Sequence, residues 1–395
     1  MADNYRILTL NSISSIGLKR LPSERYTCGA QVTDPDAILV RSQDMHKMDI
    51  GVNVKTIGRA GAGTNNIPVG LMSKRGVPVF NAPGANANAV KELVLAAMLM
   101  AARNIVPAAR FVDGLKGDDA SLHKQVEDGK KHFSGSELPR RTLGIIGLGK
   151  IGSLVADSAI KLGMNVIGFD PHITVDAAWS LPSQVRKAHS VEEVLKASDF
   201  VTVHVPLVDA TRNLINAERL KLMKHGAILL NFARDGIVDD VATVAALEAK
   251  QLRWYMCDFP AQALAGHAHV VALPHLGAST KEAEDNCAIM VVDQVRDYLE
   301  NGNIVNAVNF PDVTMGREAA WRLGIANANV PNMVGQISTA LANAGLNIHN
   351  MLNKSKGEMA YTLVDVDSPV KQEVVSSLAG IEGVLSVRYM PAPDA

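Results

Sequence analysis

The sequence predicts an α/β protein with two doubly wound, Rossmann-like parallel sheets and a C-terminal ferredoxin-like domain of βαββαβ order. Two series of short apolar, β-branched segments alternate with helical or turn-rich pieces, which is the rhythm of βα units in a parallel sheet. The end of the chain changes to the order strand, helix, strand, strand, helix, strand. With 395 residues, 47% of them hydrophobic, the chain is long enough for two or three domains with their own cores.

The expected elements of the first series run to about residue 82. The strands are "RILTL", "AILVR", "VKTIGRAG" and "VPVFN", and "ANANAVKELVLAAMLMAARNIV" then predicts a long helix. Residues 113–141 are polar and Gly-rich, which favours a connection or hinge. We assign residues 1–86, together with 276–308, to a substrate-binding domain.

The second series is expected to form a nucleotide-binding domain over residues 87–275. Its strands are "TLGIIG", "NVIGFD", "DFVTVHV", "GAILLNFA" and "VVALPH", with helical segments between them. Residues 309–317 form the expected linker. Residues 318–395 form the expected C-terminal domain, with strands at "AWRLGIANAN", "LNIHNMLNKSK", "MAYTLVDVD" and "VLSVRYM".

Composition argues against several classes of function. The 39 lysine and arginine residues nearly balance the 40 aspartate and glutamate residues, so no overall field draws the chain to nucleic acid or to an anionic membrane. The sequence has no signal-peptide pattern at its start, no apolar run long enough to span a bilayer, and three scattered cysteines that are not at metal-ligand spacing. We expect a soluble, cytoplasmic protein that acts on a small molecule, without membrane, nucleic acid or metal.

A glycine-rich loop, "GLGKIG", follows the first strand of the second series and opens a helix. Gly147 allows a tight turn, Gly149 lets a pyrophosphate approach the backbone, and Gly152 lets helix and strand pack closely. The next strand ends in Asp170, whose carboxylate can accept both ribose hydroxyls and would repel a 2′-phosphate. The pattern therefore predicts NAD as the cofactor; a turn or N-cap role for Asp170 before Pro171 is the alternative.

Two basic side chains follow strands of the second series. His275 comes directly after the last strand, and Arg234 follows the preceding apolar strand at the same carboxyl edge. An arginine fork pairs with a carboxylate, and an imidazole exchanges a proton with a hydroxyl or carbonyl near neutral pH. Together they suit oxidation of a 2-hydroxy acid beside a nicotinamide. Taken singly, a satisfied buried histidine and a surface ion pair are the alternatives.

These motifs resemble the D-isomer-specific 2-hydroxyacid dehydrogenases over nearly the whole chain. The segments that carry the resemblance are "GRAGAGTNNI", "RGVPVFNAPGANANAVKE", "GLGKIG", "HVPL", "NFARDGIVD", "PHLGAST" and "YLENGNIVNAVNFP", in the order of the family. The C-terminal domain resembles an ACT domain, a small-molecule sensor fold. The resemblance implies NAD-dependent oxidation of 3-phospho-D-glycerate to 3-phosphohydroxypyruvate, the entry to serine synthesis. Another 2-hydroxy acid, such as glycerate or glycolate, and a non-catalytic NAD-sensing protein are the alternatives.

The resemblance also implies roles for individual residues. Arg234 would hold the substrate carboxylate and His275 would be the general acid/base. Besides the glycines and Asp170, the implied cofactor contacts are Lys150, Ile151, Phe232, Ala233, Asp258, Gly277 and Ala278. The implied substrate contacts are Arg41, Ser42, Gly61, Ala62, Gly63 and Asn86. Arg41 and Ser42 would bind the phosphate end, with a strand-end ion pair as the alternative for Arg41.

The chain departs from the family pattern near His275. The family's usual partner of this histidine is a glutamate a few residues beyond the aspartate of its "DVF" motif, but this chain has no acid between Asp258 and His275. Gln262 is the nearest related side chain, and Asp235 stands where many relatives carry glycine. We hypothesise that Asp235 or Gln262 orients the imidazole ring instead.

The C-terminal domain carries a candidate effector site. In feedback-regulated relatives serine binds where ACT domains pair, and the matching residues here are Asn329 and Asn347. Asn327 and Asn332 stand where histidine and glycine are commoner, so serine control and a purely oligomerising role both stay open. The resemblance further implies a homodimer or homotetramer that associates through the nucleotide-binding domain.

Overall fold

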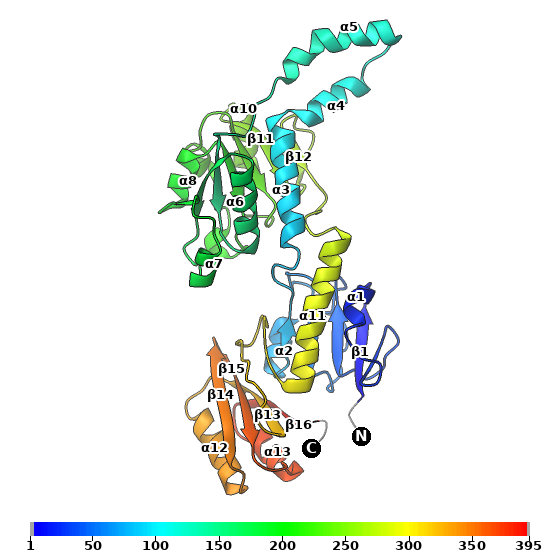
Figure 1. Ribbon diagram of the computed structural model, residues 1–395, viewed down its shortest axis with the longest axis vertical. Coiled ribbons are helices and arrows are strands. Elements are labelled where there is room, and N and C mark those ends of the chain that lie inside the picture. Colours follow the sequence, from blue (N-terminus) through cyan, green and yellow to red (C-terminus); the bar gives the residue numbers. More distant parts are fainter. Residues whose placement is uncertain (1–3, 393–395) are drawn as a thin grey trace. The chain divides into compact units, whose positions relative to one another are not determined.

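The computed structural model describes residues 4–392, apart from the side chain of Asp176, and the chain forms two compact units (Figure 1). One unit combines the residues up to Asn86 with those from Lys281 onward, and the other is Ala87–Thr280. Each unit has its own hydrophobic cores. Among the described residues, no helix combines the length and the apolar character that crossing a bilayer requires.

The first unit contains a five-stranded parallel sheet of order β2-β1-β3-β4-β5. Its strands are β1 (Tyr5–Leu10), β2 (Tyr26–Gly29), β3 (Ala37–Val40), β4 (Thr56–Arg59) and β5 (Val79–Phe80). The helices of this part are α1 (Ser15–Leu18), α2 (Val69–Lys74) and α11 (Lys281–Asn301). The central strand β3 is buried along its whole length, as a continuous apolar run predicts for a parallel strand covered on both faces.

The same unit holds a four-stranded antiparallel sheet of order β14-β15-β13-β16. The elements are β13 (Trp321–Ala328), α12 (Met333–Asn343), β14 (Ile348–Lys356), β15 (Met359–Val366), α13 (Gln372–Ala379) and β16 (Val384–Pro391). One face of this sheet packs with α12 and α13. The other face contributes Tyr361, Leu363 and Met390 to one core with α11 and the first sheet. The ferredoxin-like order is confirmed.

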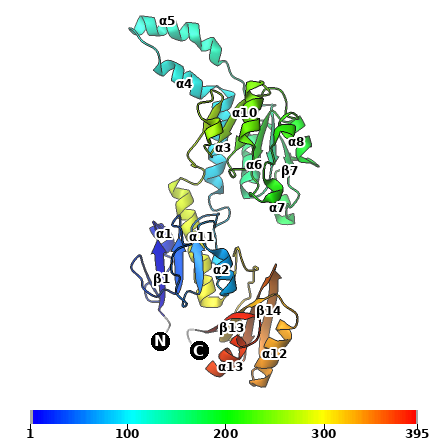
Figure 2. The ribbon, with the colours of Figure 1, turned by 180° about the vertical axis from the view of Figure 1, so that it is seen from behind.

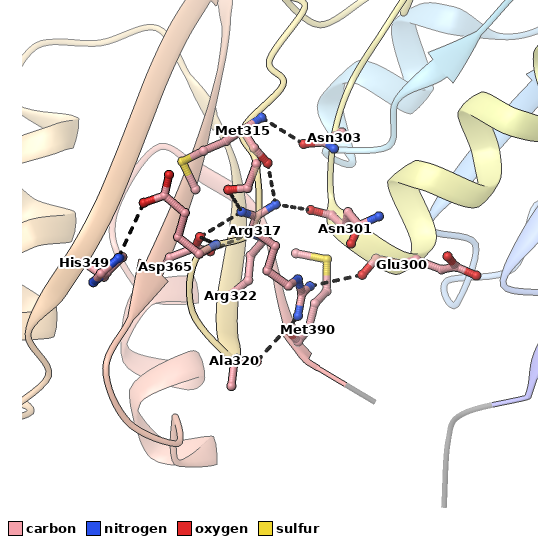
Figure 3. Close-up of polar contacts among 12 residues, drawn as sticks. Glu300, Asn301, Asn303, Met315, Arg317, Ala320, Arg322, His349, Asp365 and Met390 are labelled. Atoms are coloured by element: carbon pink, nitrogen blue, oxygen red, sulfur yellow. Dashed lines mark hydrogen bonds and ion pairs between the residues drawn. The ribbon is translucent and has the colours of Figure 1, made fainter. Parts of the chain in front are cut away.

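Three arginines cap the carboxyl end of α11. The last four carbonyl groups of an α-helix have no partner within the helix. Here Arg388 donates to Tyr298 and Leu299 at 2.8 and 2.9 Å, Arg317 donates to Glu300 at 3.1 Å, and Arg322 donates to Asn301 at 3.1 Å. Figure 3 shows the bonds from Arg317 and Arg322. The C-terminal domain and the linker before it therefore complete the hydrogen bonding of a helix that belongs to the preceding domain.

Arg322 is fully buried, and Asp365 balances its charge (Figure 3). Its Nε and Nη2 donate to the two carboxylate oxygens at 2.6 and 2.8 Å. The remaining bonds reach the carbonyls of Asn301, Met315 and Gly316. A buried ion pair is tolerated only with such additional hydrogen bonds, so this cluster fixes the segment before β13 against the domain that follows.

The second unit contains a seven-stranded parallel sheet of order β12-β11-β10-β9-β6-β7-β8. Its strands are β6 (Thr142–Ile146), β7 (Asn165–Phe169), β8 (Arg186–Lys187), β9 (Phe200–Val203), β10 (Ala227–Asn231), β11 (Leu252–Cys257) and β12 (Val270–Ala272). The helices that accompany these strands are α3 (Ala87–Ala102), α6 (Lys150–Lys161), α7 (Val175–Trp179), α8 (Val191–Ala197), α9 (Ala217–Leu220) and α10 (Asp240–Glu248). The strand order reverses between β6 and β9, the position at which such sheets bind ligands. The predicted fold class is confirmed.

Two expectations for this unit are wrong. A strand that the sequence pattern does not single out, β11, lies between β10 and β12, so the strands before Arg234 and His275 are not neighbours. Residues 113–141 are not a simple connection, because they contain the helix α5 (Asp119–Gly129) and the 3₁₀ turn Lys130–Phe133. Figures 1 and 2 both show α5 and the preceding α4 (Ile105–Asp113) reaching away from the sheet as an arm.

Candidate active site

The glycine-rich loop between β6 and α6 has the geometry that a dinucleotide needs. At Gly147 φ is +96°, and a Cβ there would lie 2.6 Å from a backbone oxygen. A Cβ at Gly152 would lie 2.0 Å from the Gly147 oxygen, so the helix packs directly on the loop. Nothing lies within 4 Å of a Cβ built at Gly149, which leaves the backbone there open to a diphosphate. Lys150 and Ile151 begin α6, whose first N–H groups lack helical partners.

Asp170 follows β7, and the backbone holds its carboxylate. Its Oδ2 accepts from the Leu148 N–H and its Oδ1 from the His172 N–H, both at 2.9 Å. The residue lines a cavity of about 510 Å³ with apolar walls that include Ile173 and Leu181. Asp170 thus has the turn role that the sequence left open as an alternative. Each of its carboxylate oxygens nevertheless keeps a further lone pair that can accept from a ribose hydroxyl.

Arg234 stands on a loop that Asn231, the buried last residue of β10, fixes in place. The Asn231 Nδ2 donates to the Arg234 carbonyl at 2.9 Å, and its Oδ1 accepts from the Ala233 N–H at 3.2 Å. Phe232 and Ala233 are buried, whereas the Arg234 side chain is exposed and its Nη1 donates to the Ala233 carbonyl at 2.6 Å. Asn231 is not among the predicted site residues, although its place at the end of a buried strand is a signal for it.

His275 lies in the turn after β12, in the left-handed conformation with φ +57°. Its N–H donates to the Leu273 and Asp258 carbonyls, at 3.0 and 3.1 Å. The buried Asp258 carboxylate accepts from the N–H groups of Leu276 and Gly277, each at 2.7 Å. A non-glycine residue at positive φ costs of order 1 kcal/mol or more, and these four bonds hold the turn in that conformation.

The His275 side chain is exposed and contacts the ring of Phe259. The two ring centroids are 5.1 Å apart in an edge-to-face arrangement with an interplanar angle of 62°. Gln262 begins the 3₁₀ turn Gln262–Leu264, and Asp235 is exposed beside Arg234. Within residues 4–392 neither side chain forms a hydrogen bond with the His275 ring. The hypothesis that Asp235 or Gln262 orients the His275 ring is therefore not supported by a hydrogen bond in the structure.

In the other unit, two arginines lie at the ends of adjacent strands. Arg41 follows β3, and Arg59 is the last residue of β4. Arg41 Nη2 donates to Glu284 Oε1 at 2.6 Å, which is the ion pair left open as an alternative. Arg59 Nε donates to the Arg41 carbonyl at 3.0 Å. Arg59 is not among the predicted site residues, although it ends an apolar strand at the same sheet edge as Arg41.

The predicted substrate turn, residues 61–63, follows Arg59 directly. A Cβ at Gly61 would lie 1.9 Å from Arg59 Nη1, so the guanidinium lies against this turn only because residue 61 is glycine. Ser42 is exposed next to Arg41, and Asn86 is half-buried just before α3. The sheet edge of this unit thus combines two guanidinium groups with the backbone of a glycine-rich turn.

A cavity of about 160 Å³ lies in the C-terminal domain beside the first residues of α12. Asn327, Asn329 and Asn332 are among the residues that line it. Asn327 is buried; its Nδ2 donates to the next carbonyl at 2.7 Å, and its Oδ1 has no partner among the described residues. Asn347 is exposed and does not line the cavity. The structure thus places one of the two predicted effector residues, Asn329, at this cavity.

Sequence comparisons identify relatives of most of the chain. The family model described as "D-isomer specific 2-hydroxyacid dehydrogenase, NAD binding domain" matches residues 95–277. The chain is 35% identical to the D-3-phosphoglycerate dehydrogenase of Methanocaldococcus jannaschii, over 85% of this chain and 62% of that protein. The enzymes of the same name from Synechocystis sp. and Haemophilus influenzae are 36% and 33% identical, over 79% and 83% of this chain and 55% and 79% of theirs. The chain therefore spans about three fifths of the length of the first two relatives.

Solved structures resemble the chain over the same extent. A protein of Thermus thermophilus is 28% identical and aligns with a TM-score of 0.64, over 77% of this chain and 99% of that one. The NAD⁺-bound 3-phosphoglycerate dehydrogenase of Entamoeba histolytica aligns with a TM-score of 0.60 at 24% identity, over 77% of this chain and 98% of that one. The second likeness concerns the fold alone.

Proposed function

Because this chain belongs to the D-isomer-specific 2-hydroxyacid dehydrogenase family, we propose that it oxidises 3-phospho-D-glycerate to 3-phosphohydroxypyruvate, with NAD as its cofactor, as the first step of serine synthesis. One observation carries the proposal. Arg234 and His275 follow β10 and β12, whose carboxyl ends lie at the same edge of one parallel sheet as the glycine loop after β6.

Each side chain has a task in this oxidation. Arg234 offers two N–H donors to the substrate carboxylate. His275, as a neutral imidazole, accepts the proton of the C2 hydroxyl. Arg41 and Arg59 supply positive charge for the phosphate. A bound NAD would supply the acceptor for the hydride from C2.

A second candidate is the oxidation of an unphosphorylated 2-hydroxy acid such as glycerate. The ion pair of Arg41 with Glu284, at 2.6 Å, favours it, since this carboxylate neutralises the Arg41 guanidinium and would repel a phosphate.

The experiment compares NADH formation from 3-phosphoglycerate and from glycerate. We expect a higher kcat/KM for the phosphorylated acid and expect Arg59→Met to lower only that value, by tenfold or more, which corresponds to at least ~1.4 kcal/mol. A preference for glycerate supports the second candidate. Turnover of neither acid, despite NADH binding, would reject both in favour of an NAD-sensing protein.

We infer further that the chain is a homo-oligomer joined through the arm of α4 and α5. The helix α4 buries none of its residues within the described chain and exposes Ile105 and Val112. An amphipathic helix of this kind is stable when a partner covers its apolar side. Light scattering should give a multiple of 42.1 kDa for the protein and a smaller mass for Val112→Lys. A monomeric wild-type protein would refute this assembly.

The cavity beside α12 supports control by an amino acid, and we propose L-serine as the effector. The Asn327 Oδ1 is a buried acceptor without a partner in the described chain, which an ammonium or hydroxyl donor would satisfy. Calorimetry should detect serine binding to the protein and at least tenfold weaker binding to Asn327→Leu, a loss of ~1.4 kcal/mol or more. If calorimetry detects no binding heat with serine, the result would favour a purely oligomerising role for the C-terminal domain.

A further inference from the structure

We propose that Phe259 positions the imidazole of His275, in the place of an acidic partner. This inference rests on the proposed oxidation of a 2-hydroxy acid, in which His275 accepts a proton. Phe259 follows Asp258 at the end of β11, and His275 follows β12, the strand paired with β11. The contact thus joins two neighbouring strand ends at the sheet edge.

The backbone around these two residues is fixed by hydrogen bonds. The His275 N–H donates to the Asp258 carbonyl, and the Asp258 carboxylate accepts from the two N–H groups that follow His275. Asp258 is 1% exposed, so water does not compete for these bonds. These bonds therefore fix the backbone at Asp258 and in the turn of His275, and what remains free is rotation of the two side chains.

The ring of Phe259 limits that rotation. Its centroid lies 5.1 Å from that of His275 at an interplanar angle of 62°, the edge-to-face geometry that aromatic pairs prefer. The contact therefore restricts the orientations that the imidazole can adopt at the sheet edge. Asp258, the nearest acid that precedes His275 in the sequence, accepts hydrogen bonds from backbone N–H groups with both carboxylate oxygens.

Kinetics of two variants test the role. Edge-to-face pairs contribute enough that Phe259→Leu should lower kcat about fivefold and leave the KM for NAD unchanged. Phe259→Tyr keeps the ring and should stay within about twofold of the wild-type kcat. An unchanged kcat in folded Phe259→Leu overturns the inference. A wild-type protein that oxidises no 2-hydroxy acid refutes the proposed function instead.

A proton NMR measurement tests the contact without activity. The ring current of Phe259 displaces the imidazole signals of His275, which are assigned by their loss in His275→Gln. Phe259→Leu should move these signals toward the random-coil position, and Phe259→Tyr should not. His269 is the internal control, because its ring lies 5.1 Å from that of Trp254 and its signals should stay in place. An unmoved His275 signal, or equal movement of both histidines, contradicts the proposed contact.

Discussion

A substitution at Gly149 should weaken cofactor binding without lowering the stability of the fold. A Cβ there would meet nothing within 4 Å, so alanine should cost the fold little, but it would occupy the space where the diphosphate approaches the backbone. We expect Gly149→Ala to unfold near the wild-type temperature and to bind NADH at least tenfold more weakly, a change of ~1.4 kcal/mol or more. Calorimetric titration measures this, with Gly51→Ala, which is equally open, as the control. Unaltered NADH affinity in Gly149→Ala would place the dinucleotide elsewhere.

The acids after Arg234 make stability depend on pH. Burial, followed by the charges of Asp235 and Asp239, raises the pKa of Asp240 to about 6. Because the unfolded carboxyl titrates near ~3.9, the folded state binds the proton more tightly, and this group's contribution to stability is lost as the pH rises from about 4 to about 6. Asp240→Asn should therefore be more stable than the wild type at pH values above ~6, by about 1 kcal/mol after allowance for solvent screening.

Urea unfolding at pH ~4 and pH ~7 checks this prediction. The two proteins should have similar free energies of unfolding at the lower pH and differ at the higher one. An equal gain at both values would show that the substitution acts through packing and not through charge.

At the scale of one element, α11 depends on guanidinium groups that it does not contain. Arg388 donates to two of its last carbonyls and lies 4.4 Å above the Tyr298 ring. Hydrogen bonds of charged donors contribute ~1.5–3 kcal/mol each, so Arg388→Met should lower the free energy of unfolding by about 3 kcal/mol. Arg20 pairs with Asp293 on the exposed side of the same helix, and Arg20→Met should change stability little. Equal effects of the two substitutions would argue against capping.

The elements also show what the sequence pattern can and cannot predict. Strands such as β3, β6 and β10 are recognisable because continuous apolar runs are typical of strands buried on both faces. The helix α5 is not predicted from the sequence because it packs on no core and has no apolar stripe. A local signal for it is Asp118, which caps the helix by accepting from the Ser121 N–H at 3.0 Å. The strand β11 reads "LRWYMC", a mixture that fits a helix as well as a strand.

For the whole molecule, chain order predicts which residues meet at a sheet edge but not how each is held. The glycine loop and Asp170 both follow strand ends; in the structure Gly147 forms a tight turn, the backbone at Gly149 is open, and Asp170 lines a cavity. Asn231 supports Arg234 through local bonds, and its place at a strand end is a signal for it. The contact of Phe259 with His275 could not be predicted, because it is tertiary and depends on how the turns close. The domain limits given from the sequence stay a prediction.

The two units differ in which residues they need in order to fold, and two shortened proteins can test this difference. All predicted NAD contacts lie in Ala87–Thr280, whose two cores draw on no other residues. We expect residues 87–280 alone to fold and bind NADH but to oxidise nothing, since Arg41 and Arg59 are missing. A chain that ends at residue 316 loses Tyr361, Leu363 and Met390 from the core around α11, together with the arginines that cap that helix.

The chain that ends at residue 316 should therefore unfold far below the full chain or aggregate, because each large core side chain contributes ~2–5 kcal/mol. Scanning calorimetry of the three proteins decides the matter. A truncated chain that keeps the full-length melting temperature would mean that the C-terminal domain is an independent appendage, and the shared core and the arginine caps would then carry no stability.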